Sequence, residues 1–257
     1  MNGRTLVYQS FRTHNVPSWM TTCMESVKAW ADLRGYEYRF VDDSFFDYVP
    51  DWFREAVNGQ RHLVSDLARL ELAKEYLGEG WDRVIWLDAD TFIVEPALFQ
   101  VDDRQGVMVS RELWMAMRDE EVVFFERANN SVMTFRKGEP FLSFYIEACK
   151  RIVRSRKGDF PHTAIGTKFL TGIAHRLSMI VGAVTFSPLN LIALYNNDDE
   201  LNRLYFKNLA SPIHAVNLCL TFRDMTYRGT VIDDLVYTTI MENLASGVYQ
   251  TRYGVSQ

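Results

Sequence analysis

The chain is predicted to adopt an α/β fold, because short apolar runs alternate with longer amphipathic segments over about its first hundred residues. This order is typical of βαβ units, and it predicts a mainly parallel central sheet flanked by helices. The composition agrees: 47% hydrophobic and 14% aromatic residues in a chain of 257 are ample for a packed core. One domain spanning residues 1–257 is therefore expected.

The elements of the first half follow from local patterns. Leu63, Leu67 and Leu70 fall on one face of a helical segment. Gly35 and Gly78 follow amphipathic segments, where glycine commonly ends a helix. The predicted elements are, in order, a strand at 6–9, a helix at 18–33, a strand at 36–41, a helix at 63–77 and a strand at 83–87.

The second half is less regular in pattern. Short strands are expected after Pro212. The other predicted elements are strands at 107–110, 131–135 and 183–186, and helices at 140–153, 163–175 and 233–244.

Charge and composition exclude several classes of protein. The net charge of −5 argues against a nucleic-acid surface, and no apolar stretch approaches the ~20 residues that a membrane span needs. The three cysteines are far apart, which favours a reduced, cytoplasmic compartment. A basic run at 150–157 is either the solvated end of a helix or a patch for an anionic acceptor or a membrane surface. The second interpretation would place the protein at the inner face of the membrane.

The acidic doublet Asp88 and Asp90 is the most informative feature of the sequence. It directly follows the apolar run 84–87, so both side chains lie at the end of a strand, where open α/β sheets place their ligands. Two like charges so close need a counter-charge, and a hard divalent cation with oxygen ligands provides one. The doublet therefore predicts a metal site that grips a nucleotide diphosphate.

Asp66 and Arg69 form a second polar feature. Three residues apart, they are neighbours on the helix predicted at 63–77. An intrahelical ion pair is the usual interpretation of such a pair. Because this helix leads directly into the strand that carries the doublet, a role in the site is the alternative.

These residues together resemble a known family. The strings 65–69 (Ser-Asp-Leu-Ala-Arg) and 86–90 (Trp-Leu-Asp-Ala-Asp) resemble the DXD sugar-binding region of GT-A glycosyltransferases. The opening segments 7–11, 16–19, 35–38 and 42–43 are similar to the branch that includes fungal initiating mannosyltransferases and clostridial glucosylating toxins. Gly78-Glu79-Gly80 departs from the usual paired glycines, and the C-terminal tryptophan signature of that branch is missing.

The resemblance implies a GT-A, Rossmann-like domain, with a nucleotide-sugar-binding half at 1–110 and an acceptor-side half at 111–257. It implies a donor such as a UDP- or GDP-sugar and a glycan, lipid-linked or protein hydroxyl as acceptor. Transfer of a hexose, with retention of anomeric configuration, is the reaction that this branch mostly performs.

The resemblance also implies roles for single residues. Asp88 would face the ribose and sugar, and Asp90 would bind Mn²⁺ or Mg²⁺. Asp66 and Arg69 would contact sugar hydroxyls and the phosphate region, while Gln9, Ser10 and Phe11 would frame the base and ribose. Asn130 is expected to face the transferred sugar, although turn chemistry also explains an Asn-Asn pair.

A metal held by one or two carboxylates needs further ligands. His214, in the string Ile-His near the end of the chain, is expected to supply one, with Asn217 as a weaker neighbour. The alternative for His214 is a hydrogen-bonded core histidine.

Three rival functions remain open. A phosphatase of the haloacid dehalogenase type also carries Asp-x-Asp, but Thr91 comes one position too early for that motif. A nucleotidyltransferase usually has a Gly-rich loop after its first strand, which is missing here. A non-catalytic sugar-binding protein would not need Asp66, Arg69 and the doublet together.

Overall fold

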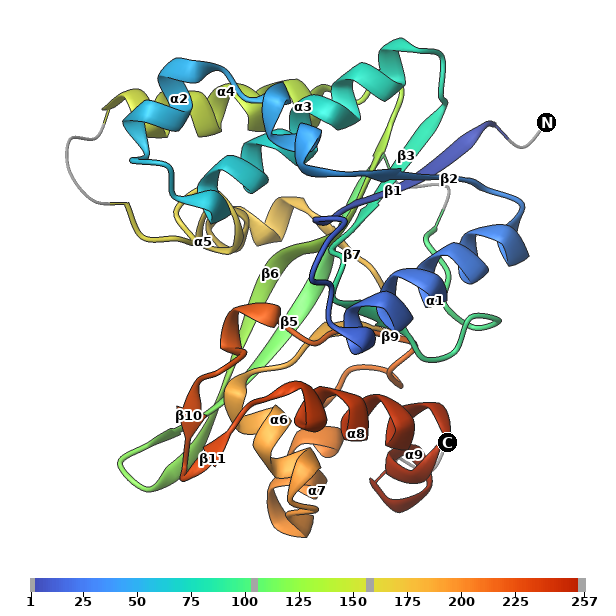
Figure 1. Ribbon diagram of the computed structural model, residues 1–257, viewed down its shortest axis with the longest axis vertical. Coiled ribbons are helices and arrows are strands. Elements are labelled where there is room, and N and C mark those ends of the chain that lie inside the picture. Colours follow the sequence, from blue (N-terminus) through green and yellow to red (C-terminus); the bar gives the residue numbers. More distant parts are fainter. Residues whose placement is uncertain (1–2, 103–105, 156–159, 254–257) are drawn as a thin grey trace.

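The computed structural model describes residues 3–102, 106–155 and 160–253, and these form an α/β structure built around a six-stranded sheet (Figure 1). The strands are β1 (Thr5–Ser10), β2 (Glu37–Val41), β3 (Arg83–Leu87), β4 (Thr91–Ile93), β5 (Val107–Arg118), β6 (Glu121–Arg136), β7 (Ser178–Met179), β8 (Ala183–Thr185), β9 (Ala215–Asn217), β10 (Thr226–Tyr227) and β11 (Thr230–Val231). The helices are α1 (Ser18–Arg34), α2 (Asp51–Ala56), α3 (Arg61–Gly78), α4 (Pro140–Ser155), α5 (Thr167–Gly172), α6 (Pro188–Tyr195), α7 (Asp199–Asn208), α8 (Asp234–Ala245) and α9 (Val248–Tyr253). Short 3₁₀ turns lie at Asp43–Tyr48, Ala174–Arg176 and Leu220–Phe222.

The sheet has the strand order β2-β1-β3-β6-β5-β7. β1 pairs in parallel with both β2 and β3, whereas β6 runs antiparallel to its neighbours β3 and β5. Because β7 is parallel to β5, β6 is the strand that opposes the others. The predicted mainly parallel α/β sheet is confirmed, and β3 delivers the acidic doublet at the sheet's middle.

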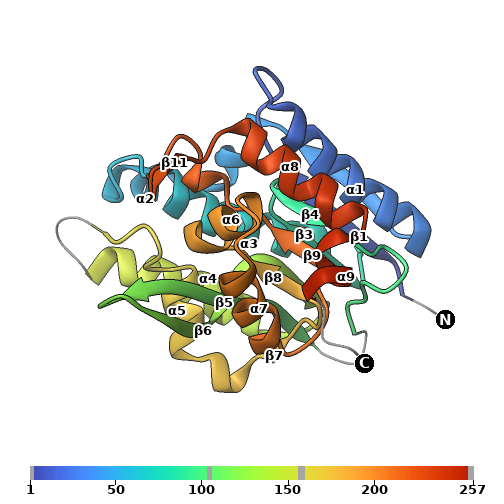
Figure 2. The same ribbon diagram turned by 90° about the horizontal axis from the view of Figure 1, so that it is seen from below.

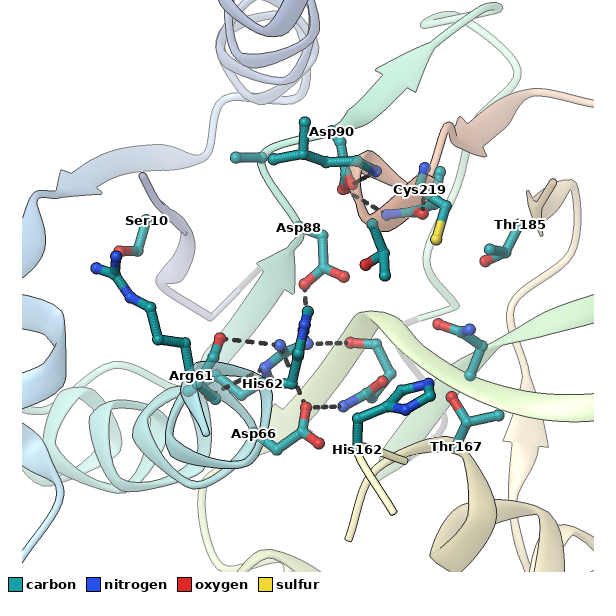
Figure 3. Close-up of a pocket in the computed structure, with 18 of the residues that line it drawn as sticks. Ser10, Arg61, His62, Asp66, Asp88, Asp90, His162, Thr167, Thr185 and Cys219 are labelled. Carbon is teal, nitrogen blue, oxygen red and sulfur yellow. Dashed lines mark hydrogen bonds and ion pairs between the residues drawn. The ribbon is translucent and has the colours of Figure 1, made fainter. Parts of the chain in front are cut away.

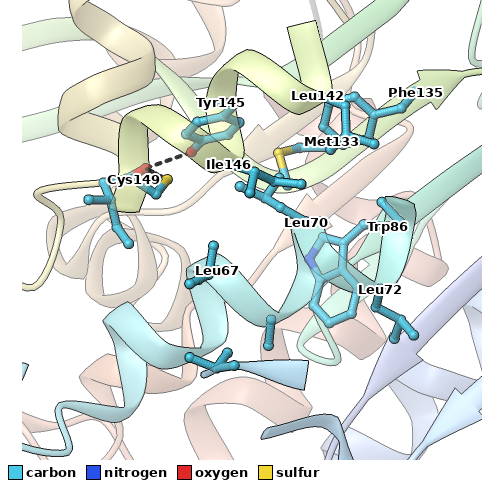
Figure 4. Close-up of a cluster of buried hydrophobic side chains, with 14 of the residues drawn as sticks. Leu67, Leu70, Leu72, Trp86, Met133, Phe135, Leu142, Tyr145, Ile146 and Cys149 are labelled. Atoms are coloured by element: carbon cyan, nitrogen blue, oxygen red, sulfur yellow. Dashed lines mark hydrogen bonds between the residues drawn. The ribbon is translucent and has the colours of Figure 1, made fainter. Parts of the chain in front are cut away.

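Helices cover both faces of the sheet, with α3 and α4 on one side and α1 on the other (Figure 1). The alternation along β1 explains this arrangement: Leu6 and Tyr8 join one buried cluster and Val7 joins another. Leu67 and Leu70 of α3 pack with Trp86 and with residues of α4 (Figure 4). This packing fixes α3 beside the strand that ends at Asp88.

The largest difference from the sequence prediction is the β5–β6 ribbon. Short strands were expected at 107–110 and 131–135, but the two strands continue far past the sheet as a twisted antiparallel hairpin. Leu113 and Met115 on one face of this ribbon pack into the C-terminal core, which stabilises the extension. The mixed charged and apolar residues of the ribbon hid this alternation in the sequence.

The C-terminal half also contains helices that the sequence did not reveal, α6 and α7, which gather with α8 and α9 beside the ribbon (Figure 2). α2 was missed as well. The helix expected at 163–175 is broken into α5 and a 3₁₀ turn, with Gly172 at the break. α2 and α5 are short and α6 is apolar on nearly every side, so helical periodicity is weak in them. α7 is amphipathic and was overlooked.

Among the described residues, no helix is both long and apolar enough to cross a membrane. Cys23, Cys149 and Cys219 are free thiols. Within the basic run, Lys150 pairs with Glu71 at 2.6 Å and Arg154 lies over the Trp52 ring, while Arg156 and Lys157 lie outside the described residues.

Candidate active site

A cavity of about 900 Å³ opens where β1 and β3 end, and the acidic doublet lies in its middle (Figure 3). Ser10 and Arg61 lie on one side of the doublet, and Thr167 and Thr185 lie on the other. The volume is at the upper end of the range of about 300–1,000 Å³ for ligand sites. Its polar lining residues include Ser10, Arg12, Asp43, Arg61, His62, Ser65, Asp66, Arg69, Asp88, Asp90, Glu112, Arg127, Asn129, Asn130, His162, Thr163, Thr167, Thr185, Asn217 and Thr221.

Asp88 is held by one of its two carboxylate oxygens. Oδ1 accepts hydrogen bonds from Trp86 Nε1 (2.7 Å) and Arg69 Nη1 (2.8 Å). No hydrogen bond from the described residues reaches Oδ2. Burial raises the pKa of Asp88 to about 7, and the nearby Asp90 adds to this against the opposing effect of Arg69. The Asp88 carboxylate thus lines the cavity without enough nearby positive charge to balance its own charge.

Asp90 is anchored by the C-terminal part of the chain. Its Oδ1 accepts a hydrogen bond from Asn217 Nδ2 (2.6 Å), and its Oδ2 accepts one from the backbone N–H of Leu220 (2.7 Å). Burial raises its pKa, and these two hydrogen bonds lower it in part. Since each carboxylate oxygen has two lone pairs, both remain able to accept a further partner.

Arg69 connects the parts of this wall. Its Nη1 donates to Asp88 Oδ1 and to the carbonyl of Asn130 (3.0 Å). Its Nη2 donates to Ser65 Oγ (3.1 Å) and lies 3.3 Å from Asp66 Oδ1, and its Nε donates to the Ser65 carbonyl. All five N–H groups of a guanidinium are then in use. In this structure Arg69 therefore holds the carboxylates in place, and its expected contact with the donor stays a prediction.

Asp66 and Asn130 meet across the cavity wall. Asn130 Nδ2 donates to Asp66 Oδ1 at 2.7 Å, and both residues are buried. Gly166 packs directly against them, because a Cβ at this position would lie 2.7 Å from Asp66 Oδ2. Burial raises the pKa of Asp66, and Arg69 opposes this rise. Asp66, Arg69, Asp88 and Asn130 are called the helix wall below.

A break in the β5–β6 pairing explains the place of Asn130. Val109 pairs with Met133 but the next residue, Ser110, pairs with Asn129, so residues 130–132 have no partner on β5. Such bulges re-aim side chains near functional sites. Here the bulge turns Asn130 toward α3. The sequence placed Asn130 at the start of a strand, whereas the structure places it in the middle of a long one.

Two of the three residues expected to frame the base and ribose line the cavity. Ser10 and Phe11 line the cavity. Gln9 does not: it is fully buried, donates to the Asp88 carbonyl (3.1 Å) and accepts from Tyr38 Oη (3.0 Å). Gln9 therefore stabilises the backbone of Asp88 without lining the cavity. Phe45, stacked on Trp86, also lines the cavity, and nothing in the sequence pattern marked it.

His214 lies away from the doublet. β9 pairs with β4 so that Asn217 is opposite Thr91, next to Asp90, while the His214 carbonyl accepts from the N–H of Val94 at the other end of β4. The imidazole packs against Gly182, and burial lowers its pKa. The residue that reaches Asp90 from this strand is the weaker candidate, Asn217. Among the described residues, no group of three or more His, Cys, Asp and Glu side chains is arranged to hold a metal.

Sequence reasoning also missed Glu112. It is 3% exposed, yet it lines the cavity from the β5–β6 ribbon. A charged residue on a strand, next to another charged residue such as Arg111, usually faces water. The burial of its neighbours Leu113 and Met115 in the C-terminal core could have indicated that Glu112 lies on the opposite face of the strand, toward the cavity. That inference requires recognising the β5–β6 ribbon in the sequence.

Comparisons with known proteins complete the description. No protein-family model and no curated protein matches the chain. Solved structures with a similar arrangement include a glycosyltransferase involved in glycosylation of the PBCV-1 major capsid (12% identity, 95% of this chain and 99% of that chain, TM-score 0.41). Others are mouse xyloside xylosyltransferase 1 in its apo form (13%, 85% and 98%, 0.44) and the galactosyltransferase LgtC with donor and acceptor sugar analogs (15%, 93% and 95%, 0.46). At these values the likeness assigns no function to this chain, so the chemistry of the cavity has to supply it.

Proposed function

We propose that this chain is a metal-dependent glycosyltransferase, which moves a hexose from a nucleotide-diphosphate sugar to a hydroxyl acceptor. One observation carries the proposal: Asp66, Asp88 and Asp90 line one cavity, and among the described residues the guanidinium of Arg69 pairs with Asp66 and Asp88 but not with Asp90. Buried carboxylates without enough positive charge are costly. A divalent cation that binds together with a diphosphate would supply the missing positive charge.

The available oxygen ligands suit Mn²⁺ or Mg²⁺. Asp88 Oδ2 faces no protein donor among the described residues, and Asp90 keeps lone pairs on both oxygens. Hard oxygen ligands from one or two carboxylates, completed by substrate phosphates and water, are the usual way in which proteins hold Mg²⁺. We propose that Asp90 and Asp88 hold the ion. When bound, it would neutralise the negative charge that develops on the departing diphosphate.

The chain's own groups would prepare the donor for transfer. Phe11 and Phe45 offer apolar surface at one end of the cavity, which suits the base and ribose of a UDP- or GDP-sugar. Asp66 retains Oδ2 facing the cavity beside Gly166, and we propose that it accepts a hydrogen bond from a sugar hydroxyl. Arg69 and Gln9 would keep the carboxylates in this geometry, which avoids reorganisation during the reaction.

Asn130 would orient the transferred sugar through Asp66, to which its amide is already bonded. Retention of anomeric configuration is proposed from the resemblance of the sequence alone. The ¹H NMR coupling constant of the anomeric proton in the product tests it directly.

A thermal-shift panel of UDP- and GDP-sugars, with and without Mn²⁺, tests the proposed function. The melting temperature should rise with sugars of one base only when Mn²⁺ is present, because ion and diphosphate bind together. A panel in which no nucleotide sugar raises the melting temperature, with or without metal, would contradict the proposal.

A further inference from the structure

A second wall of the cavity is formed by the β5–β6 ribbon. Glu112, Trp114, Arg127 and Asn129 line it, and they are called the ribbon wall below. The proposed donor contacts come from α3, β1 and β3, so none of these four residues takes part in them. Glu112 is buried and the other three are half-buried, so this wall offers the cavity polar groups that the donor does not use.

Glu112 is the buried member of the ribbon wall, and its carboxylate is poorly paired. Its only hydrogen bond in the described residues is from Asn129 Nδ2 to Oε2, at 3.4 Å, which is long for such a bond. The residue is 3% exposed, so water has little access to it. Burial raises the pKa of Glu112, and Arg127 and Asn129 offset the rise in part. A buried carboxylate with one weak partner is expected to accept hydrogen bonds from a ligand.

The neighbours of Glu112 define the chemistry of that ligand. The guanidinium of Arg127 lies 5.1 Å from the centre of the Trp114 ring, whose edge meets Phe222. A carboxylate, a guanidinium and an amide beside an aromatic surface provide acceptors and donors for hydroxyl groups and an apolar face for ring C–H groups. A pyranose sugar carries both kinds of surface.

The ribbon wall and the doublet line the same cavity, and Cys219 lines it as well. Figure 3 shows Cys219 beside Asp90 on the side of the cavity that faces Thr185. A ligand on the ribbon wall would therefore occupy the same cavity as the proposed metal site.

We infer that the ribbon wall is the acceptor subsite and that it takes a sugar, whose hydroxyl groups donate hydrogen bonds to Glu112. This inference rests on the proposed function, because it supplies the hydroxyl acceptor of that reaction. It assigns the acceptor to a carbohydrate rather than to a protein or lipid hydroxyl.

Saturation-transfer NMR with methyl α- and β-glycosides of glucose, galactose and mannose tests the inference. Titrations use the wild type, Glu112→Gln and Arg127→Gln, each with UDP or GDP plus Mn²⁺ and again without nucleotide. Glu121→Gln, an exposed glutamate on the same ribbon, is the matched control. At least one glycoside should bind the wild type and the control, and Glu112→Gln should weaken its binding by about tenfold, because hydrogen bonds to a charged group are stronger than those to a neutral one.

The nucleotide serves as the internal reference. Affinity for UDP or GDP with Mn²⁺ should be the same in Glu112→Gln as in the wild type. If neither nucleotide binds the wild type with Mn²⁺, the proposed function fails, and the titrations without nucleotide still report on Glu112. Equal glycoside affinity in the wild type and both ribbon variants, or no glycoside bound by the wild type, would overturn the subsite.

Discussion

The helix wall and the ribbon wall of the cavity differ in how fully their polar groups are paired. In the helix wall, Arg69 has every donor engaged, and Asp66, Asp88 and Asn130 are joined by bonds of 2.7–3.0 Å. In the ribbon wall, Glu112 has one partner at 3.4 Å. A connected network holds its members in fixed positions, whereas an under-bonded group keeps capacity for a ligand. The first wall therefore fixes its carboxylates in place through one oxygen each, and the second offers a buried carboxylate that is poorly paired.

Arg69→Ala is the substitution that should most strongly affect the helix wall and so test this difference between the two walls. It removes the guanidinium that pairs with both Asp66 and Asp88, so the free energy of unfolding should fall by about 3–5 kcal/mol. Chemical denaturation measures this loss. Arg39→Ala is the control, because Arg39 pairs with Glu79 on the surface and its loss should cost at most about 1 kcal/mol. Equal costs for the two variants would show that the helix wall is not a coupled network.

Gly166→Ala tests how tightly the helix wall is packed. The added methyl group would meet Asp66 and Asn130, so we expect a loss of about 1–3 kcal/mol in stability and weaker binding of the donor. Gly172→Ala, where no atom lies within 4 Å of the new Cβ, should change neither. Thermal unfolding and nucleotide titration read the two effects. An unchanged Gly166→Ala protein would mean that Asp66 can move freely.

The smallest effect is expected on the ribbon wall. Glu112→Gln replaces a buried charge with a neutral group, and at pH 7 the free energy of unfolding should rise or stay within about 1 kcal/mol of the wild type. The sign follows from its raised pKa: burial disfavours the ionised form in the folded state, so the cost of Glu112 is present at high pH. The stability gained by Glu112→Gln should therefore shrink as the pH falls through the raised pKa of Glu112. A loss of several kcal/mol at pH 7 would place Glu112 in a structural network instead.

The sequence was sufficient for the parts of the site that depend on local order. Asp88 and Asp90 follow a buried strand and Asp66 and Arg69 share a helix face, so adjacency in sequence predicts adjacency in space. Their specific roles were harder: Arg69 was expected to reach the donor, but its partner Asn130 comes from a bulge between strands that pair over a long range. The positions of Asn217 and Glu112 in the cavity also depend on the register of strands that are far apart in the sequence. His214 and Asn217 are three residues apart on one segment, and only the pairing of β9 with β4 decides which meets Asp90.

The central claim is that the acidic doublet binds a divalent ion together with a nucleoside diphosphate. Isothermal titration of UDP and GDP into the wild type and Asp90→Asn, with and without Mn²⁺, tests it most directly, with Asp32→Asn as a control for net charge on the exposed face of α1. One nucleotide should bind the wild type and the control at least about tenfold more tightly with Mn²⁺, a gain of about 1.4 kcal/mol. Asp90→Asn should lose that gain while remaining folded. The same Mn²⁺-dependent gain in Asp90→Asn as in the wild type would contradict the claim.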